Sequence, residues 1–142
     1  MKVIKVRVWD RGRMFYSDSQ EDAEVLGAKL GDSCIATFFA HFYGRKLMFY
    51  ITLKDKNQHE VYAGDIVNEG ANHASVIEWC EHNEKIEGTG WCLHELDPRR
   101  RRIYHSTGAF TTIPGSWRVI GNIFETPQLL PAWYRKTLEE QG

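Results

Sequence analysis

Hydrophobic and polar residues alternate over several short stretches of this chain, and this period of two is typical of half-buried β-strands. The first stretch runs from Lys2 to Asp10. It is followed by the turn residues Asp10–Arg13 and an extended Met14–Tyr16, which together predict a β-hairpin. Further β-branched and aromatic runs, separated by Gly, Asn, Asp and Pro, lie at 34–43, 46–53, 60–69, 74–81, 90–96 and 116–124. This succession of short strands predicts a mainly β domain, built as a sandwich or a small barrel.

Helical patterning is confined to two segments. Residues 19–30 begin with Ser19, which suits an N-cap, and carry acids in the first turn, while Gly27 indicates that the helix is short. The tail at 131–142 is expected to form a helical or a frayed extension, and its segment at 131–134 is apolar. Such a segment packs either on its own domain or on a neighbouring subunit, so we expect the protein to form a homo-oligomer.

Composition and charge place the chain among ordered globular proteins. Its 142 residues are 42% hydrophobic and 13% aromatic, enough for one domain with a substantial core. A formal net charge of -1 excludes a globally basic nucleic-acid binder and leaves only local basic patches to consider. No stretch approaches the ~18 consecutive apolar residues of a membrane span, and charges interrupt the apolar positions near Met1. We therefore expect a cytoplasmic protein whose three cysteines are reduced.

Residues 53–67, LKDKNQHEVYAGDIV, gather acids, lysines and a histidine, but their order is that of a turn rather than of a reactive centre. The segment from Asp55 to Gln58 lies between two extended runs and carries the Asp and Asn that favour a tight reversal. Gly64 and Asp65 interrupt the next apolar run and indicate a local break before a buried strand. We interpret the carboxylates of Asp55 and Asp65 as acceptors for nearby backbone N–H groups.

Five segments spread along the chain carry recognisable motifs: RVWD at 7–10, MFY at 14–16, LMFYITLKDKNQHEVYAGDIV at 47–67, VIEW at 76–79 and VIGNIFETPQLL at 119–130. Together they resemble the YopX family of phage and prophage proteins. The resemblance implies a mainly β (α+β) fold, with one domain at 1–130 and a C-terminal extension at 131–142. Within that domain it implies a small SH3-like barrel over roughly 53–130 and a variable N-terminal part.

The chain departs from the usual YopX pattern at two positions. It has Thr52 and Gln58 where that family usually has glycine. A side chain held in the left-handed region costs about 1 kcal/mol. Either Gln58 carries this strain, or the turn differs and Asn57 takes the positive φ.

Two Cys-x-His pairs, Cys80–His82 and Cys92–His94, are candidate metal ligands. Residues two apart on a strand project to the same face, so each pair presents two ligand-type side chains together. A hairpin register with Cys80 opposite His94 also places His82 opposite Cys92, and it gathers the nitrogen and sulfur ligands that zinc prefers. The spacing is not that of a zinc ribbon, so ordinary buried cysteines and surface histidines are the alternative.

Four consecutive arginines, Arg99, Arg100, Arg101 and Arg102, form the strongest charge run, and Tyr104 follows them closely. Guanidinium groups bind phosphates while an aromatic ring stacks on a base, so this segment is a candidate nucleic-acid interface. The alternative is a solvated loop, or a strand edge protected by charge against wrong pairing.

Recognised catalytic signatures are absent from the sequence: it has no nucleophile elbow, phosphate-binding loop, dinucleotide fingerprint or zinc-protease helix motif. The family resemblance likewise carries no established activity, cofactor or catalytic residue. We therefore expect a non-catalytic binding protein of a bacterial host's cytoplasm, which associates with itself or with another protein and has no cofactor. Nucleic-acid binding through the arginine run is one alternative. A metal-dependent or thiol enzyme built on the Cys/His pairs is the other.

Overall fold

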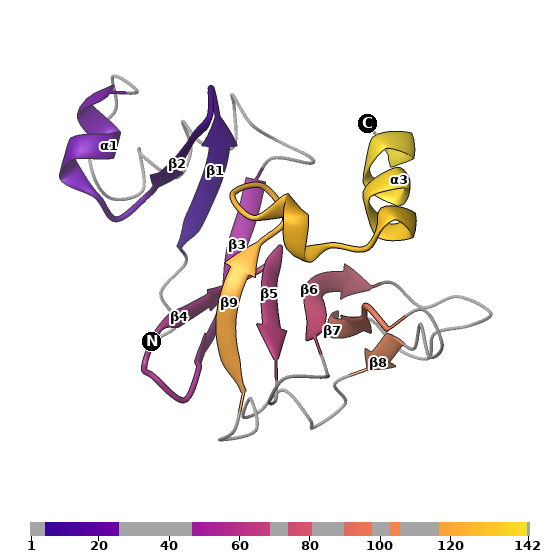
Figure 1. Ribbon diagram of the computed structural model, residues 1–142. Coiled ribbons are helices and arrows are strands. Elements are labelled where there is room, and N and C mark those ends of the chain that lie inside the picture. Colours follow the sequence, from indigo (N-terminus) through magenta and orange to yellow (C-terminus); the bar gives the residue numbers. More distant parts are fainter. Residues whose placement is uncertain are drawn as a thin grey trace. The chain divides into compact units, whose positions relative to one another are not determined.

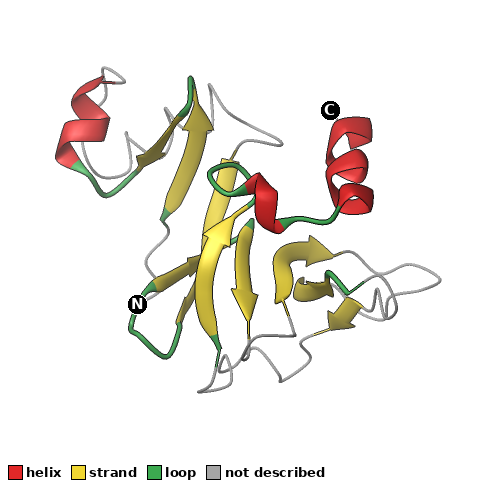
Figure 2. Cartoon of the chain, in the orientation of Figure 1, coloured by secondary structure: helices red, strands yellow, loops and turns green. Residues whose placement is uncertain are grey.

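The computed structural model describes residues 5–25, 47–68, 74–80, 90–97, 103–105 and 117–141. Over these residues the protein is mainly β, as Figures 1 and 2 show, and this confirms the expected fold class. The chain divides into two compact units, Met1–Tyr50 and Ile51–Gly142. The strand expected at 34–43 and the end of the helix expected at 19–30 lie outside the described residues.

The N-terminal unit begins with a tight β-hairpin, as the sequence predicts. Strand β1 (Val6–Asp10) pairs antiparallel with β2 (Arg13–Tyr16). The two residues between the strands, Arg11 and Gly12, both have positive φ, at 51° and 74°. Positive φ at both central residues is the signature of the type I′ turn, whose twist matches that of the flanking strands.

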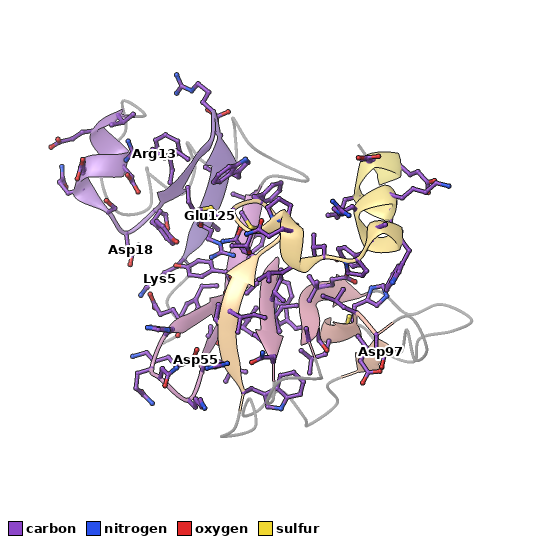
Figure 3. All side chains as sticks on the ribbon, viewed as in Figure 1. Lys5, Arg13, Asp18, Asp55, Asp97 and Glu125 are labelled. Carbon is purple, nitrogen blue, oxygen red and sulfur yellow. The ribbon has the colours of Figure 1, made fainter. Side chains whose placement is uncertain are left out.

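Helix α1 (Gln20–Val25) follows the hairpin and is tied to it through one buried acid. The hydroxyl of Ser19 accepts a hydrogen bond from the N–H of Asp22, as expected of an N-cap. The carboxylate of Asp22 in turn accepts bonds from the N–H of Tyr16 and from the guanidinium of Arg13, which Figure 3 labels. The hydrophobic core of this unit consists of Val6, Val8, Phe15 and Ala23, with Leu47 and Phe49 packed against it.

Strand β3 (Leu47–Lys54) crosses the division between the two units. Its first residues pair with β1, with Val6 opposite Phe49. Beyond Tyr50 it lies beside β4 (Glu60–Tyr62), to which it is joined by the turn expected at Asp55–Gln58. The run at 60–69 was expected to be one strand, but it divides into β4 and β5 (Asp65–Asn68) at Gly64, whose φ is 88°.

The C-terminal unit contains a five-stranded antiparallel sheet in the order β8-β7-β6-β5-β9. Its other strands are β6 (Ala74–Cys80), β7 (Gly90–Glu95), β8 (Ile103–His105) and β9 (Arg118–Asn122). Strand β8 was not expected from the sequence, because three residues are too short for an alternating pattern to stand out.

Two hydrophobic clusters lie within this unit. One consists of Ile51, Val61, Val67 and Ile77, with Leu53, Trp91, Leu93, Trp117 and Val119 against it. The other consists of Ile66, Val76, Leu96, Leu130 and Tyr134, with Ala74, Ile120, Ile123, Trp133 and Leu138 against it. The second cluster includes the C-terminal helix α3 (Ala132–Gln141), which follows β9 and the 3-10 helix η1 (Pro127–Leu129).

Candidate functional site

The Asp55 carboxylate, which the sequence singles out, holds the turn between β3 and β4. Asp55 as a whole is only 2% exposed, and its side chain accepts bonds from the N–H groups of Asn57 and His59, at 2.8 and 2.9 Å. Its second oxygen accepts a bond from the N–H of Val119 on β9, at 2.9 Å. Asp55, labelled in Figure 3, therefore joins the hairpin turn to the far strand of the five-stranded sheet.

These contacts set the ionisation of Asp55. Burial by itself raises the pKa of the carboxyl, but the three backbone N–H groups and the charge of His59 outweigh burial, so its pKa lies below the usual value. A carboxylate held in this way stays ionised at neutral pH, and its lone pairs are directed at the backbone. It is an acceptor that stabilises the fold rather than a general base.

Asp65 and Asn122 also stabilise turns by accepting hydrogen bonds from backbone N–H groups. Asp65 is buried and accepts a bond from the N–H of Tyr62, at 2.8 Å, across the sharp turn at Gly64. The side-chain oxygen of Asn122 accepts bonds from the N–H groups of Phe124 and Glu125, at 3.0 and 2.8 Å. Asp55, Asp65 and Asn122, which all lie within the motifs that carry the family resemblance, therefore hold turns of the C-terminal unit.

Thr52 and Gln58, the two residues that stand where that family usually has glycine, both lie in the left-handed region. Their φ values are 68° and 66°. Gln58 therefore takes the positive φ itself, and Asn57 does not. Positive φ is unusual for a β-branched residue such as Thr52, whose hydroxyl bonds to the carbonyl of Ile51.

A polar cluster made of Glu78, His94 and Tyr134 lies between β6, β7 and α3 of the C-terminal unit. Glu78 on β6 lies within 3.1 and 3.2 Å of Nδ1 of His94 on β7, through its two carboxylate oxygens. The hydroxyl of Tyr134, on α3, donates a hydrogen bond to the same carboxylate. The side chains of Glu78 and His94 are 28% and 16% exposed, so the pair is half-buried beneath the helix.

Aromatic rings complete this cluster. The His94 ring contacts the rings of Trp133 and Tyr134, with centroids 5.5 and 5.4 Å apart. Burial, together with the charge of Glu78 and the hydrogen bond to it, raises the pKa of the Tyr134 phenol far above its usual value. The phenol therefore remains a hydrogen-bond donor at every physiological pH, which suits it to anchor the helix.

Sequence reasoning singled out His94 but missed its true partners. Glu78 lies inside a strand, and Tyr134 is 56 positions away from it, so no local spacing links them. The sequence did, however, indicate that the segment containing Trp133 and Tyr134 needed a surface to pack on. The structure places that segment on its own unit.

The register assumed for the two Cys-x-His pairs is wrong. Cys80 lies opposite Gly90, not opposite His94, and His94 lies opposite Val76. The apolar pair Ile77 and Leu93 aligns the two strands, because their side chains pack in one cluster. His82 lies outside the described residues, so the four-ligand site stays a prediction. Among the residues that are described, no three His, Cys, Asp or Glu side chains are grouped so as to hold a metal.

Cys92 is buried and disulfide-bonded, so the expectation of reduced cysteines is wrong for this residue. The inference failed because the sequence shows no regular cysteine framework, whereas a single bridge requires only one neighbouring thiol. In the disulfide form, Cys92 has no thiolate to act as a nucleophile.

The arginine run at 99–102 lies outside the described residues, and the side chain of Tyr104 does too. The nucleic-acid interface therefore stays a prediction. The backbone of β8, which follows the run, is the last strand of the five-stranded sheet in the described part of the chain. Within the described residues, no helix is both long enough and apolar enough to span a membrane.

Comparison with known proteins agrees with the family resemblance that the motifs indicate. Residues 5–131 match the YopX family, described as "YopX protein". No curated protein matches the chain. Among solved structures, the chain is similar to the crystal structure of protein EF1440 from Enterococcus faecalis, at 20% identity and a TM-score of 0.35, over 91% of this chain and 76% of that one. Because the family match extends over far more than half of its residues, the chain belongs to the YopX family.

Proposed function

We propose that this protein is a phage- or prophage-encoded interaction module without catalytic activity, which acts in the host cytoplasm and associates with copies of itself. The observation that carries the proposal is that three buried aspartates bond to the protein's own backbone. Asp22, Asp55 and Asp65 each accept hydrogen bonds from backbone N–H groups of their own unit. These acids stabilise turns and a helix, so they are not directed at a substrate.

Of the two carboxylate–imidazole pairs among the described residues, Glu78–His94 is the closer, at 3.1 Å against 3.7 Å for Asp55–His59, and its surroundings favour a structural role. A carboxylate beside an imidazole orients the ring for proton transfer when a nucleophile or substrate lies on the other side. Here the rings of Trp133 and Tyr134 pack against His94, and the Tyr134 hydroxyl bonds to Glu78. The pair therefore supports the docking of α3, and a binding function fits it better than catalysis.

The self-association part of the proposal comes from the apolar segment of the C-terminal tail. In the structure, Trp133, Tyr134 and Leu138 of α3 pack in a hydrophobic cluster of their own unit, and the opposite face of the helix carries exposed charged residues. Contact between copies therefore uses a surface other than the apolar face of α3.

Sedimentation equilibrium of the purified full chain over a wide range of concentrations tests the proposal. We expect the weight-average mass to rise from that of one chain, 16.5 kDa, towards a small multiple of it. A mass equal to one chain at every concentration would overturn self-association. Affinity capture from prophage-bearing cells, with and without nuclease, tests whether further partners are proteins or are recruited through nucleic acid.

A further inference from the structure

Basic residues gather where the turn between β3 and β4 meets the beginning of β9. Lys54 ends β3, Lys56 lies in the turn, and Arg118 begins β9. The turn and the strand are neighbours, since the N–H of Lys56 donates to the carbonyl of Trp117 at 3.0 Å, and Figure 1 shows the turn beside the beginning of β9. Lys54, Lys56 and Arg118 are all exposed, and together they form the basic face of the C-terminal unit.

The side chains at the two ends of this face point to the same side. Leu53 and Val119 both pack against the same hydrophobic cluster. Successive side chains of a strand point to opposite faces, so Lys54 and Arg118 are directed away from that cluster. The Nε of Arg118 accordingly donates to the side-chain oxygen of Asn68, its partner on β5, at 3.2 Å. The basic face is therefore a surface, and the hydrophobic core lies behind it.

The acids near the basic face do not balance its charge at the surface. Asp55 is only 2% exposed, and its oxygens accept bonds from three backbone N–H groups. Glu60, the next acid along the chain, is half-buried on β4. Within the described part of the chain, Lys54 and Lys56 form no ion pair, and Arg118 bonds to a neutral amide. The exposed charge here is therefore positive.

Basic side chains at other described surfaces are accompanied by acids. In the N-terminal unit three of them form ion pairs: Lys5 with Asp18, Arg11 with Asp10 and Arg13 with Asp22. On α3, two basic residues are followed one turn later by two acids: Arg135 and Lys136, then Glu139 and Glu140. The basic face differs from these surfaces because its cations are available to an anion from outside the chain.

The neutral groups around the basic face indicate the chemistry of its partner. The exposed amides of Asn57 and Gln58 lie in the same turn, and amides bond to phosphate oxygens as cations do. The exposed large hydrophobic residues of the described chain are Val25 and Leu129, and neither lies in this turn. Protein interfaces have an apolar core that is depleted in lysine, and membrane-binding surfaces insert apolar side chains. A face of cations and amides therefore suits the phosphate backbone of a nucleic acid.

We propose that the basic face binds the phosphate backbone of double-stranded nucleic acid without reading its base sequence. Trp117, next to Arg118, is half-buried and packs against the hydrophobic cluster. Its indole is therefore not presented to an unpaired base, and the face suits a duplex better than a single strand. This inference rests on the proposed binding function and names its partner, and it does not require self-association.

The backbone at Gln58 fits this role. Its φ of 66° lies in the left-handed region, where a residue other than glycine costs about 1 kcal/mol. Strain of this kind is concentrated at binding sites, where the side chain that causes it has a function. Gln58 presents an exposed amide beside Lys56, at a position where glycine would relieve the strain and supply no side chain.

Fluorescence anisotropy of a labelled DNA duplex of mixed sequence, titrated with the full-length protein, tests the inference. The double variant Lys54→Gln with Lys56→Gln should bind more weakly at low salt. The slope of log K against log salt should become shallower by about two, because each phosphate contact contributes about 0.9. Both lysines are exposed, so the variant should fold as the parent does, and urea unfolding checks this.

The double variant Arg135→Gln with Lys136→Gln is the matched control. It changes the net charge by the same amount at two exposed positions of α3, and it should keep the affinity and the slope of the parent. Gln58→Gly should weaken binding by about two- to tenfold, the effect of one neutral hydrogen bond, without lowering the free energy of unfolding. Its slope should stay that of the parent, since an amide releases no counterion. An unchanged affinity in Gln58→Gly would overturn the role given to the amide.

The remaining outcomes decide the proposal itself. A loss confined to the lysine variant would establish the basic face and would separate it from the run Arg99–Arg102, which both double variants retain. No binding by the parent at about 50 mM salt, or an equal loss in both double variants, would overturn it. Displacement of the duplex by polyglutamate at equal charge would also overturn it, because the face would then fit an acidic protein. Sedimentation equilibrium measures self-association independently, so either proposal can fail alone.

Discussion

The carboxylate of Asp55 accepts a hydrogen bond from the backbone N–H of Val119, which lies 64 positions later in the sequence. Through this bond a buried acid in a hairpin turn contacts strand β9, an end strand of the five-stranded sheet. The N–H of Lys56 strengthens the junction by donating to the carbonyl of Trp117, at 3.0 Å. The turn at 55–58 is thus a tertiary contact as well as a local reversal.

Replacing Asp55 should lower stability and change its pH dependence. Because the pKa of Asp55 is lower in the folded state, the ionised form contributes stability above pH ~4, and this contribution is lost as the pH falls through the folded-state pKa. We expect Asp55→Asn to reduce the free energy of unfolding by about 3 kcal/mol at pH 7 and by less at pH 3. Urea titrations at both values measure this. Asp18→Asn, at an exposed ion pair with Lys5, is the control and should change stability by under ~1 kcal/mol.

The backbone conformation at Thr52 and Gln58 lowers the stability of the folded protein. Both have positive φ, which an L side chain adopts only with strain, and Thr52 is β-branched as well. Thr52→Gly should raise the free energy of unfolding by about 1 kcal/mol, since the relief of strain exceeds the extra entropy of a glycine in the unfolded chain. Gln58→Gly should act in the same direction by a smaller amount.

Lys56→Gly provides a matched control within the same turn. Lys56 is exposed and does not have positive φ, so glycine there only adds freedom to the unfolded chain. It should lower the free energy of unfolding by about 0.5–1 kcal/mol. Chemical denaturation of the three variants side by side measures these changes in the free energy of unfolding. If Thr52→Gly and Lys56→Gly were equally destabilising, strain at Thr52 would not be significant.

Gly121 has an ordinary backbone conformation, so glycine is required there for lack of space rather than for its φ. A Cβ at this position would lie 2.1 Å from Oγ1 of Thr126, the atom that bonds to both the N–H and the carbonyl of Asn122. We expect Gly121→Ala to lower the free energy of unfolding by about 2 kcal/mol, as overpacking does. In the double variant with Thr126→Ala the contact with Oγ1 is removed, while those with Cβ of residue 126 and Cδ1 of Leu129, at 3.0 and 3.1 Å, remain, so the two effects should be less than additive. Full additivity in thermal unfolding would contradict this account.

The elements that could be predicted from the sequence are those whose cause is local. The β1–β2 hairpin follows from turn residues between alternating strands, and the roles of Asp55 and Asp65 follow from the preference of turn carboxylates for nearby N–H groups. The break at Gly64 was indicated, but the sequence did not show that it separates two strands. A glycine inside an apolar run marks either a bulge or a turn, and only the tertiary structure distinguishes the two.

What could not be predicted depends on contacts between distant residues. The register of β6 and β7 is set by apolar packing, such as that of Ile77 with Leu93, whereas we aligned the strands on Cys and His. The hydrogen bond between Tyr134 and Glu78 joins helix α3 to strand β6, and no sequence motif contains both residues. Long-range polar pairs of this kind have no signature in a single sequence, because either residue alone is unremarkable.

Tyr134 should make the protein sensitive to alkaline pH. Its pKa is raised in the folded state, so the folded protein keeps the phenolic proton where the unfolded chain releases it, and stability declines as the pH rises above ~10. We expect the stability difference between the parent and Tyr134→Phe to shrink by about 1 kcal/mol per pH unit above that value. Urea unfolding at pH 8, 10 and 11, followed by fluorescence, measures this. A stability difference that stayed constant from pH 8 to pH 11 would contradict a raised pKa at Tyr134.

One experiment distinguishes the two roles expected for the run from Arg99 to Arg102, phosphate binding and protection of a strand edge. If these arginines bind phosphates, replacing all four with alanine should weaken binding to single-stranded nucleic acid at low salt and flatten its salt dependence, because fewer counterions are released. If they only protect the edge of the sheet beside β8, nucleic-acid binding should be the same for both proteins, while the variant should aggregate more readily. Fluorescence anisotropy over a salt series measures the first effect, and light scattering measures the second. Since the formal net charge of the whole chain is -1, any binding that the parent shows must come from such a local cluster, and its loss in the variant would assign it to these four residues.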